Sequence, residues 1–212
     1  GIGSTELLQI FITNRVGDAI AGTTGYPVSG YEAKIVDDAM NELPPGSVGK
    51  LAVRGPTGCR YLDDGRQSNY VRDGWNLTGD SFVRDAKGRL SFVARSDDMI
   101  VSSGYNIAGP EVEAALLSHP AVAECGVVGA PDESRGMIVK AYVVLAGGTP
   151  GDAALTQTLQ DHVKQAIAPY KYPRAIEYVT ELPKTETGKL RRFALRQMAA
   201  ASAASLAGVA AE

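Results

Sequence analysis

A glycine, two hydroxyls and a carboxylate stand together at the start of the sequence, in Gly3-Ser4-Thr5-Glu6. A glycine lets a ligand approach the backbone closely, a hydroxyl donates to a phosphate oxygen, and a carboxylate can hold Mg²⁺. The run therefore suits the phosphates of a nucleotide. Ser and Thr before an acid are equally typical of the start of a helix, so the run alone leaves both interpretations open.

A second candidate is Asp80, which follows Leu77-Thr78-Gly79 and the turn sequence Asp73-Gly74. An aspartate just past a glycine at a strand end can accept hydrogen bonds from two vicinal hydroxyls, such as those of a ribose. An ordinary turn aspartate has the same local sequence. The charged run 95–98 (Arg-Ser-Asp-Asp) is either a solvated linker or a hinge, whose residues absorb large backbone changes.

A third candidate is Lys189, which follows Gly188 and precedes a helical pattern. The ammonium group of a lysine on such a turn is a mobile point charge, suited to a carboxylate and a phosphate that must be brought together. The alternative is a solvated basic face, because two arginines follow at 191 and 192.

Two halves of the chain must position these residues. Residues 1 to about 94 contain short apolar runs between glycine and proline turns, with strands expected at 31–36 and 48–53. Asp73-Gly74 and Lys87-Gly88 are typical of hairpin turns. This half is predicted to be all-β, forming a small barrel or a sheet.

The second half mixes helices and strands. Helices are expected at 109–119, 152–168 and 189–200, and strands at 122–128, 138–145 and 176–179. This order predicts a compact domain, and the chain as a whole is predicted to be α+β. The Ala/Ser-rich tail 199–212 is expected to be a fraying helix end or to lack order.

Composition excludes several classes of function. The net charge is −3, from 21 basic and 24 acidic residues, which gives no reason to expect nucleic acid or an anionic membrane as a partner. Cys59 and Cys125 are too far apart in sequence for metal-ligand spacing, and two reduced thiols are expected. No apolar run could span a bilayer and the first residues do not resemble a signal peptide, so a cytoplasmic location is expected.

Four motifs, at 3–6, 77–80, 95–107 and 183–192, resemble in their order and spacing the adenylate-forming superfamily of acyl-CoA synthetases, carrier-loading adenylation domains and firefly luciferase. The resemblance covers residues 1 to about 198. Residues 1–11 look most like the benzoate and 2-aminobenzoate CoA ligases. Acetate-activating relatives have a bulky aromatic at the position of Gly3, so glycine there implies room for a larger acid.

The resemblance implies a domain order and a reaction. Residues 1–94 would end a large nucleotide-binding domain, 95–97 would be a hinge, and 98–198 would form a mobile C-terminal domain. A carboxylate attacks the α-phosphate of Mg-ATP to give acyl-AMP and pyrophosphate, and the thiol of coenzyme A then displaces AMP.

The resemblance also implies roles for the nucleotide-binding residues. Thr5 would contact the α-phosphate and Glu6 would bind Mg²⁺, in a site that includes Gly3 and Ser4. Asp80 and Arg95 would hold the ribose hydroxyls.

The remaining roles concern the mobile domain. Lys189 would be the catalytic residue of the first half-reaction, and Asp97 would be the hinge about which that domain rotates. Six residues are implied in coenzyme A binding: Ser103, Gly104, Arg135, Tyr170, Lys171 and Arg174.

Some positions depart from the family pattern. Leu77 replaces a basic or polar residue, Ile2 replaces an aromatic that stacks on adenine, and Asn106 replaces an arginine of acetate-activating relatives. The family's phosphate loop and most of its acyl pocket lie upstream of the motifs present here. The N-terminal portion of the same enzyme is therefore an expected partner, and the 212 residues alone are expected to be inactive.

Three alternatives to an aromatic acid–CoA ligase stay open. One is a medium-chain acyl-CoA synthetase, the second an adenylation domain that loads a carrier protein, and the third a noncatalytic nucleotide-binding module. The last is disfavoured because Thr5, Glu6, Asp80, Arg95 and Lys189 are all present.

Overall fold

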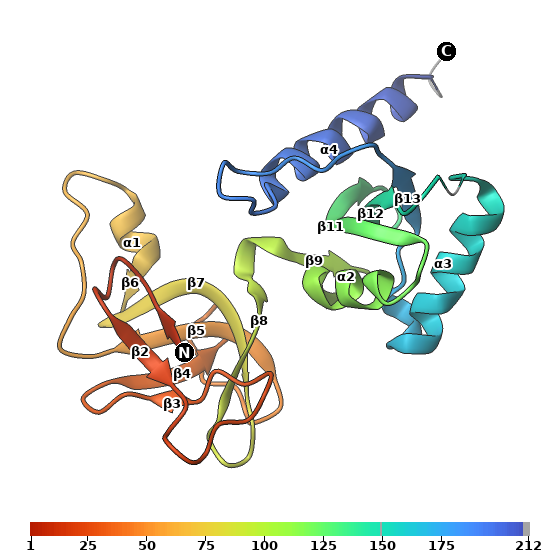
Figure 1. Ribbon diagram of the computed structural model, residues 1–212. Helices are drawn as coiled ribbons and strands as arrows, with labels where there is room; N and C mark the ends of the chain where they lie inside the picture. The colour runs from red at the N-terminus through yellow and green to blue at the C-terminus, as the bar shows by residue number, and fades with distance from the viewer. Residues whose placement is uncertain (149, 210–212) are drawn as a thin grey trace. The chain divides into compact units, whose positions relative to one another are not determined.

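The computed structural model describes residues 1–148 and 150–209, which form two compact units that divide between Asp97 and Asp98 (Figure 1). The first unit is built mainly from β-strands, and the second combines a sheet with helices. The predicted α+β class is confirmed.

The first unit contains two sheets. A three-stranded antiparallel sheet has the order β1-β2-β3, from Ile2–Gly3, Ile10–Thr13 and Tyr26–Pro27. A five-stranded sheet contains β4 (Glu32–Val36), β5 (Val48–Arg54), β6 (Val71–Arg72), β7 (Trp75–Arg84) and β8 (Leu90–Arg95), and a short helix α1 (Arg66–Tyr70) precedes β6. The sheets are open: in the described part of this unit no ladder closes a barrel, so the barrel-like form is not confirmed. Strand periodicity shows which face is buried and does not determine closure.

The long strand β7 organises the five-stranded sheet. One edge pairs with β5, whereas β6 and β8 pair with different segments of β7. The turn from β6 to β7 is Asp73-Gly74, with φ of 51° and 77°, the conformation expected of a two-residue hairpin. Both sheets share one apolar core, whose buried members include Ile12 from β2 and Phe82 from β7.

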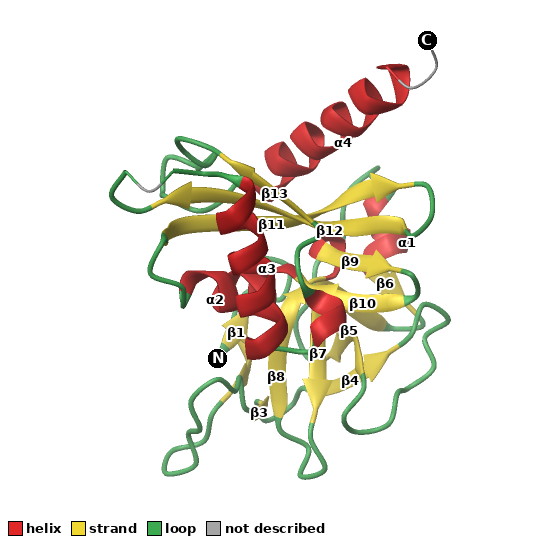
Figure 2. Ribbon diagram, turned by 90° about the vertical axis from the view of Figure 1, so that its right-hand side faces the viewer, coloured by secondary structure: helices red, strands yellow, loops and turns green. Residues whose placement is uncertain are grey.

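The second unit has a central sheet with helices on both faces (Figure 2). The strands are β11 (Val122–Asp132), β12 (Gly136–Leu145) and β13 (Ala175–Tyr178), with β12 antiparallel to β11 and parallel to β13. The helices are α2 (Gly109–Leu117), α3 (Ala153–Ala166) and α4 (Arg192–Val209). A separate hairpin joins β9 (Met99–Ser102) to β10 (Tyr105–Ala108), and a 3-10 turn lies at Pro169–Lys171. Another 3-10 turn, Ser96–Asp98, includes the last two residues of the first unit and the first of the second.

Alternation along the strands explains this layering. In β11, Val127 packs in the cluster with α2 and α3, whereas its neighbour Val128 packs in the cluster with α4. In β12, Val143 and Tyr142 divide in the same way. Successive side chains of a strand point to opposite faces, so a strand buried on both faces is apolar throughout.

Helix ends follow ordinary capping chemistry. Pro110 occupies the first turn of α2, and the side chain of Asp152 accepts a hydrogen bond from the backbone N–H of Leu155 (2.8 Å) at the start of α3. The last helix begins at Arg192, after the predicted start, and continues to Val209, through much of the Ala/Ser-rich tail. Positions 210–212 of that tail lie outside the described residues.

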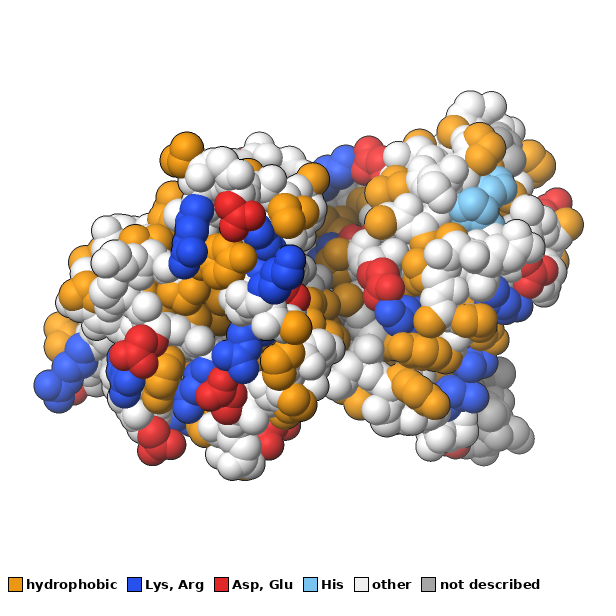
Figure 3. Space-filling view, turned by 90° about the horizontal axis from the view of Figure 1, so that it is seen from below, with side chains coloured by type: hydrophobic (Ala, Val, Ile, Leu, Met, Phe, Trp, Pro, Cys, Tyr) orange, Lys and Arg blue, Asp and Glu red, His pale blue; other side chains and the backbone are white. Residues whose placement is uncertain are grey.

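Two surface properties bear on the expected partners. In the face shown in Figure 3, basic side chains lie beside acidic ones, in keeping with the small net charge. Within residues 1–148 and 150–209, no helix combines the length and hydropathy needed to cross a membrane.

Candidate functional site

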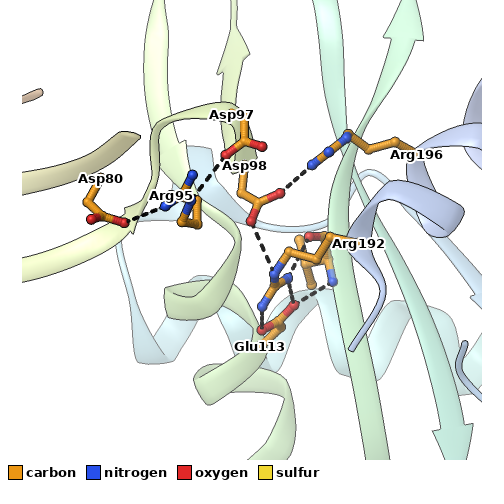
Figure 4. A network of polar contacts seen from close by, with 8 residues as sticks. Asp80, Arg95, Asp97, Asp98, Glu113, Arg192 and Arg196 are labelled. Atoms are coloured by element: carbon orange, nitrogen blue, oxygen red, sulfur yellow. Dashed lines mark hydrogen bonds and ion pairs between the residues drawn. The ribbon is translucent and has the colours of Figure 1, made fainter. Parts of the chain in front are cut away.

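Asp80 and Arg95 face each other across β7 and β8. The two residues are direct partners in the antiparallel ladder, and Arg95 Nη1 lies 3.2 Å from Asp80 Oδ1 (Figure 4). Gly79 has φ +77°, a conformation that favours glycine, and a Cβ there would lie 2.7 Å from Arg95 Nη2, at the end of a flexible side chain. The backbone conformation therefore explains the glycine before the aspartate.

The Asp80 carboxyl is strongly buried, with 7% of the residue exposed, whereas the side chain of Arg95 is half exposed. Burial raises the pKa of Asp80, against the opposing effect of the Arg95 charge. A buried carboxylate beside an exposed guanidinium leaves acceptors and donors for a ligand's vicinal hydroxyls.

Replacing Asp80 by asparagine should stabilise the first unit at neutral pH. A raised pKa means that the folded state binds the proton more tightly than the unfolded chain, so stability is lost as pH rises through the folded pKa. The fluorescence of Trp75, the single tryptophan and a residue of β7, should show a higher urea midpoint for Asp80→Asn at pH 7. The two proteins should converge below about pH 4, the ordinary pKa of an aspartate, because the carboxyl is then protonated in both the folded and the unfolded chain. An equal or lower midpoint for the variant at pH 7 would contradict this account.

Glu6 lies in a turn. The Ser4 hydroxyl accepts a hydrogen bond from the backbone N–H of Leu7 (3.2 Å), and the carbonyl of Thr5 accepts one from Leu8. No helix follows, so the helix-start interpretation of Gly3-Ser4-Thr5-Glu6 is wrong. Thr5 is exposed on this turn.

The Glu6 carboxylate is held in its ionised form. A hydrogen bond from its own backbone lowers its pKa most, and bonds from Tyr61 and Ser4 and the charge of Arg95 add to this effect, against burial. The Tyr61 hydroxyl donates to Glu6 Oε1 over 2.9 Å. Sequence reasoning missed Tyr61, which lies 55 positions away from Glu6 in a loop without a motif.

The acidic side chains determine how the expected Mg²⁺ could be bound. Among the described residues, no group of three or more His, Cys, Asp or Glu side chains could hold a metal ion unaided. Mg²⁺ is commonly bound by one or two carboxylates together with substrate phosphates and water. A single ionised carboxylate at Glu6 fits this way of binding Mg²⁺, in which phosphates and water complete the coordination.

Gly3 lies on β1. A Cβ at this position would lie 2.7 Å from the carbonyl oxygen of Gln9, a backbone atom. Close strand packing is therefore a second reason for glycine here, beside the space for a larger acid that the sequence suggested.

Asp97, the expected hinge residue, is the last residue of the first unit. Its carboxylate lies 3.5 Å from Arg95 Nε. Arg95 therefore contacts both Asp80 and Asp97 (Figure 4).

In the second unit, three of the expected coenzyme A residues come together. Ser103 and Gly104 form the two-residue turn between β9 and β10, with φ of 49° and 82°. Arg135 Nη1 donates to the Ser103 hydroxyl (3.0 Å), and the Arg135 carbonyl accepts from the Ser103 N–H (3.1 Å). Next to this turn, Tyr105 stacks on Tyr170 with ring centroids 4.5 Å apart.

The other two expected residues have structural partners. Lys171 Nζ lies 2.6 Å from Glu111 on α2. Arg174 Nη1 donates to the hydroxyl of Tyr172 (2.9 Å). Their proposed contact with coenzyme A stays a prediction.

Lys189 ends a tight turn. The N–H of Thr185 donates to the Lys189 carbonyl (2.8 Å), and the N–H of Lys189 donates to the Thr185 hydroxyl (3.1 Å). Gly188 has φ +80°, which explains the glycine. Lys189 is exposed, and within the described chain no carboxylate pairs with its ammonium group.

Comparison with known proteins gives the family. Residues 1–61 match the family model for the AMP-binding enzyme, and residues 111–189 match the model for the AMP-binding enzyme C-terminal domain. The chain belongs to the AMP-binding enzyme family. The resemblance inferred from the four motifs is thereby confirmed.

Relatives within the AMP-binding family include both aromatic and other acyl ligases. The chain is 44% identical over 205 residues to human mitochondrial acyl-coenzyme A synthetase ACSM4, covering 92% of this chain and 35% of the relative. It is 43% identical over 199 residues to benzoate–CoA ligase of Thauera aromatica, covering 92% of this chain and 38% of the relative. The chain thus spans between a third and two fifths of the length of these relatives.

Solved structures of the family are similar to this chain in fold and in sequence. The anthranilate CoA ligase AuaEII in complex with anthranoyl-AMP matches with a TM-score of 0.83 and 43% identity, over 96% of this chain and 40% of that one. A benzoate CoA ligase from Burkholderia xenovorans LB400 matches with a TM-score of 0.77 and 40% identity, over 92% of this chain and 40% of that one.

Proposed function

We propose that the chain forms the C-terminal part of an ATP-dependent carboxylic acid–CoA ligase, which makes acyl-AMP and then acyl-CoA. One observation carries the proposal. Glu6, Asp80 and Arg95 come from three separate motifs, yet they act on each other within one unit: Arg95 pairs with Asp80, and its charge lowers the pKa of Glu6.

In this proposal the first unit binds the nucleotide. Asp80 accepts hydrogen bonds from the ribose hydroxyls, and Arg95 donates to them from its exposed side. Thr5, with Gly3 and Ser4 beside it, contacts the α-phosphate. Glu6 holds Mg²⁺, which when bound would offset the negative charge of the phosphates.

The second unit supplies Lys189. Its ammonium group offsets the negative charge that builds up as a carboxylate approaches a phosphate. The unit then turns about Asp97 for thioester formation, with Ser103 and Gly104 beside the pantetheine arm. Arg135, Tyr170, Lys171 and Arg174 are proposed to contact the nucleotide of coenzyme A.

For the acid, we propose an aromatic carboxylate such as benzoate or 2-aminobenzoate. Relatives named for benzoate and anthranilate support this choice. A medium-chain acid is the second candidate, because acyl-coenzyme A synthetase ACSM4 is equally similar in sequence. The cytoplasm stays our proposal for the location.

The test is mass spectrometry of the products of the complete ligase, given ATP, coenzyme A and a panel of carboxylic acids. We expect benzoyl-CoA or 2-aminobenzoyl-CoA, with AMP released in equal amount. Medium-chain thioesters alone would select the second candidate. Adenylation without any CoA thioester would reject the CoA ligase. The 212-residue chain alone, given ATP and benzoate, should release no pyrophosphate.

A further inference from the structure

Two arginines of α4 hold the first residue of the second unit. Arg192 Nε lies 3.6 Å from Asp98 Oδ2, and Arg196, one helical turn later, bonds Asp98 Oδ1 (Figure 4). The side chain of Asp98 is only 14% exposed. The start of the unit is therefore fixed to the first turns of its last helix.

Arg192 also joins two other elements. Its Nη2 donates to Glu113 Oε2 (2.7 Å), its Nη1 bonds Glu113 Oε1, and Nη1 reaches the carbonyl of Val127 (3.3 Å). Glu113 Oε1 in turn accepts from the N–H of Val127 (2.7 Å). All three nitrogens of one guanidinium are thus used to tie α4 to α2, to β11 and to Asp98.

Lys189 lies three residues before Arg192, at the exposed end of the turn. The base of that turn is fixed by the bond from the N–H of Arg191 to the carbonyl of Pro183 (2.8 Å) and by the Lys184–Leu190 bridge. The direction in which the turn leaves the unit depends on how the start of α4 is held.

We propose that Arg192 is the positioning residue for Lys189: its contacts with Glu113 and Asp98 fix the turn that carries the ammonium group. The inference rests on the proposed function. A planar guanidinium reaches several acceptors in fixed directions, which a lysine ammonium on a flexible stem does not. Arg192→Lys therefore keeps the positive charge and removes the planar group that reaches several acceptors at once.

The experiment measures the two half-reactions separately in the complete ligase. Because small misplacements of a reacting group are costly, Arg192→Lys should slow acyl-adenylate formation by about 10- to 100-fold. Thioester formation from supplied acyl-AMP, which does not use Lys189, should stay within about 3-fold, because only the adenylation contact is displaced. Arg191→Lys is the matched control: the adjacent side chain is exposed, and both rates should be unchanged.

A purely structural role would lower both half-reactions together, in step with the melting temperature, and that result would overturn the inference. If Arg192→Lys does not fold, Asp98→Asn decides, since it leaves the Arg192–Glu113 pair intact. In the 212-residue chain, Asp98→Asn should speed hydrogen exchange at the Lys189 amide. If neither this exchange nor adenylation by the complete ligase changed, the positioning role would be overturned.

Failure of the inference is separable from failure of the proposed function. If Lys189→Ala blocks adenylation while Arg192→Lys matches the parent enzyme, only the positioning role is lost. If Lys189→Ala leaves adenylation unchanged, the role of Lys189 itself is lost.

Discussion

Replacing Lys189 by alanine should slow acyl-adenylate formation in the complete ligase by about 10²- to 10³-fold, the usual cost of removing one charge-stabilising donor. The exposed ammonium group has no ion-pair partner in the described chain, so its loss breaks no ion pair there. Pyrophosphate release from ATP and the acid measures this step. Thioester formation from supplied acyl-AMP should be retained.

Lys184→Ala is the control for this prediction. Lys184 lies at the base of the same turn and pairs with Glu124 over 2.6 Å, with both side chains more than 40% exposed. Such surface pairs contribute about 0–1 kcal/mol, so adenylation should change little. Equal losses for the two variants would assign the effect to the fold of the turn.

Glu113→Ala should destabilise the second unit by about 3 kcal/mol, because it leaves a buried guanidinium without its main partner. The side chains of Glu113 and Arg192 are 12% and 18% exposed, and the N–H of Val127 loses its acceptor as well. Urea unfolding followed by hydrogen exchange of β11 and β12 amides measures this unit separately.

Glu111→Ala, on the same helix, is the matched control. Its pair with Lys171 is more exposed, at 40% for the glutamate, so its loss should cost less than about 1 kcal/mol. If both variants lost the same stability, burial of the Glu113 pair would not be the cause.

Most elements of the fold could be predicted from sequence periodicity and turn residues. The helix expected at 109–119 is α2 (Gly109–Leu117), and Asp73-Gly74 indicated the hairpin between β6 and β7. The β9–β10 hairpin was missed because its turn, Ser103-Gly104, lies beside a charged run that indicated a linker or a hinge. A positive φ at a serine has no strong signal in sequence.

The candidate site was predictable where a motif carried it. The pairing of Asp80 with Arg95 follows from a ladder whose register one sequence does not give. The contact of Tyr61 with Glu6 joins a loop to a distant turn, so no local pattern could indicate it. Glu113 lies in a helix that the sequence predicts, but its main partner, Arg192, is 79 positions away on α4 and has no signal in the local sequence.

The adjacent carboxylates Asp97 and Asp98 differ in how strongly dissolved ions act on them. The Arg95–Asp97 pair is open to water, with side chains 52% and 64% exposed, whereas Asp98 is 14% exposed beside Arg192. At about 1 M salt the screening length falls to roughly 3 Å, which weakens exposed pairs far more than buried ones. Ionic strength should therefore weaken the Arg95–Asp97 pair and leave the Asp98–Arg192 pair almost untouched.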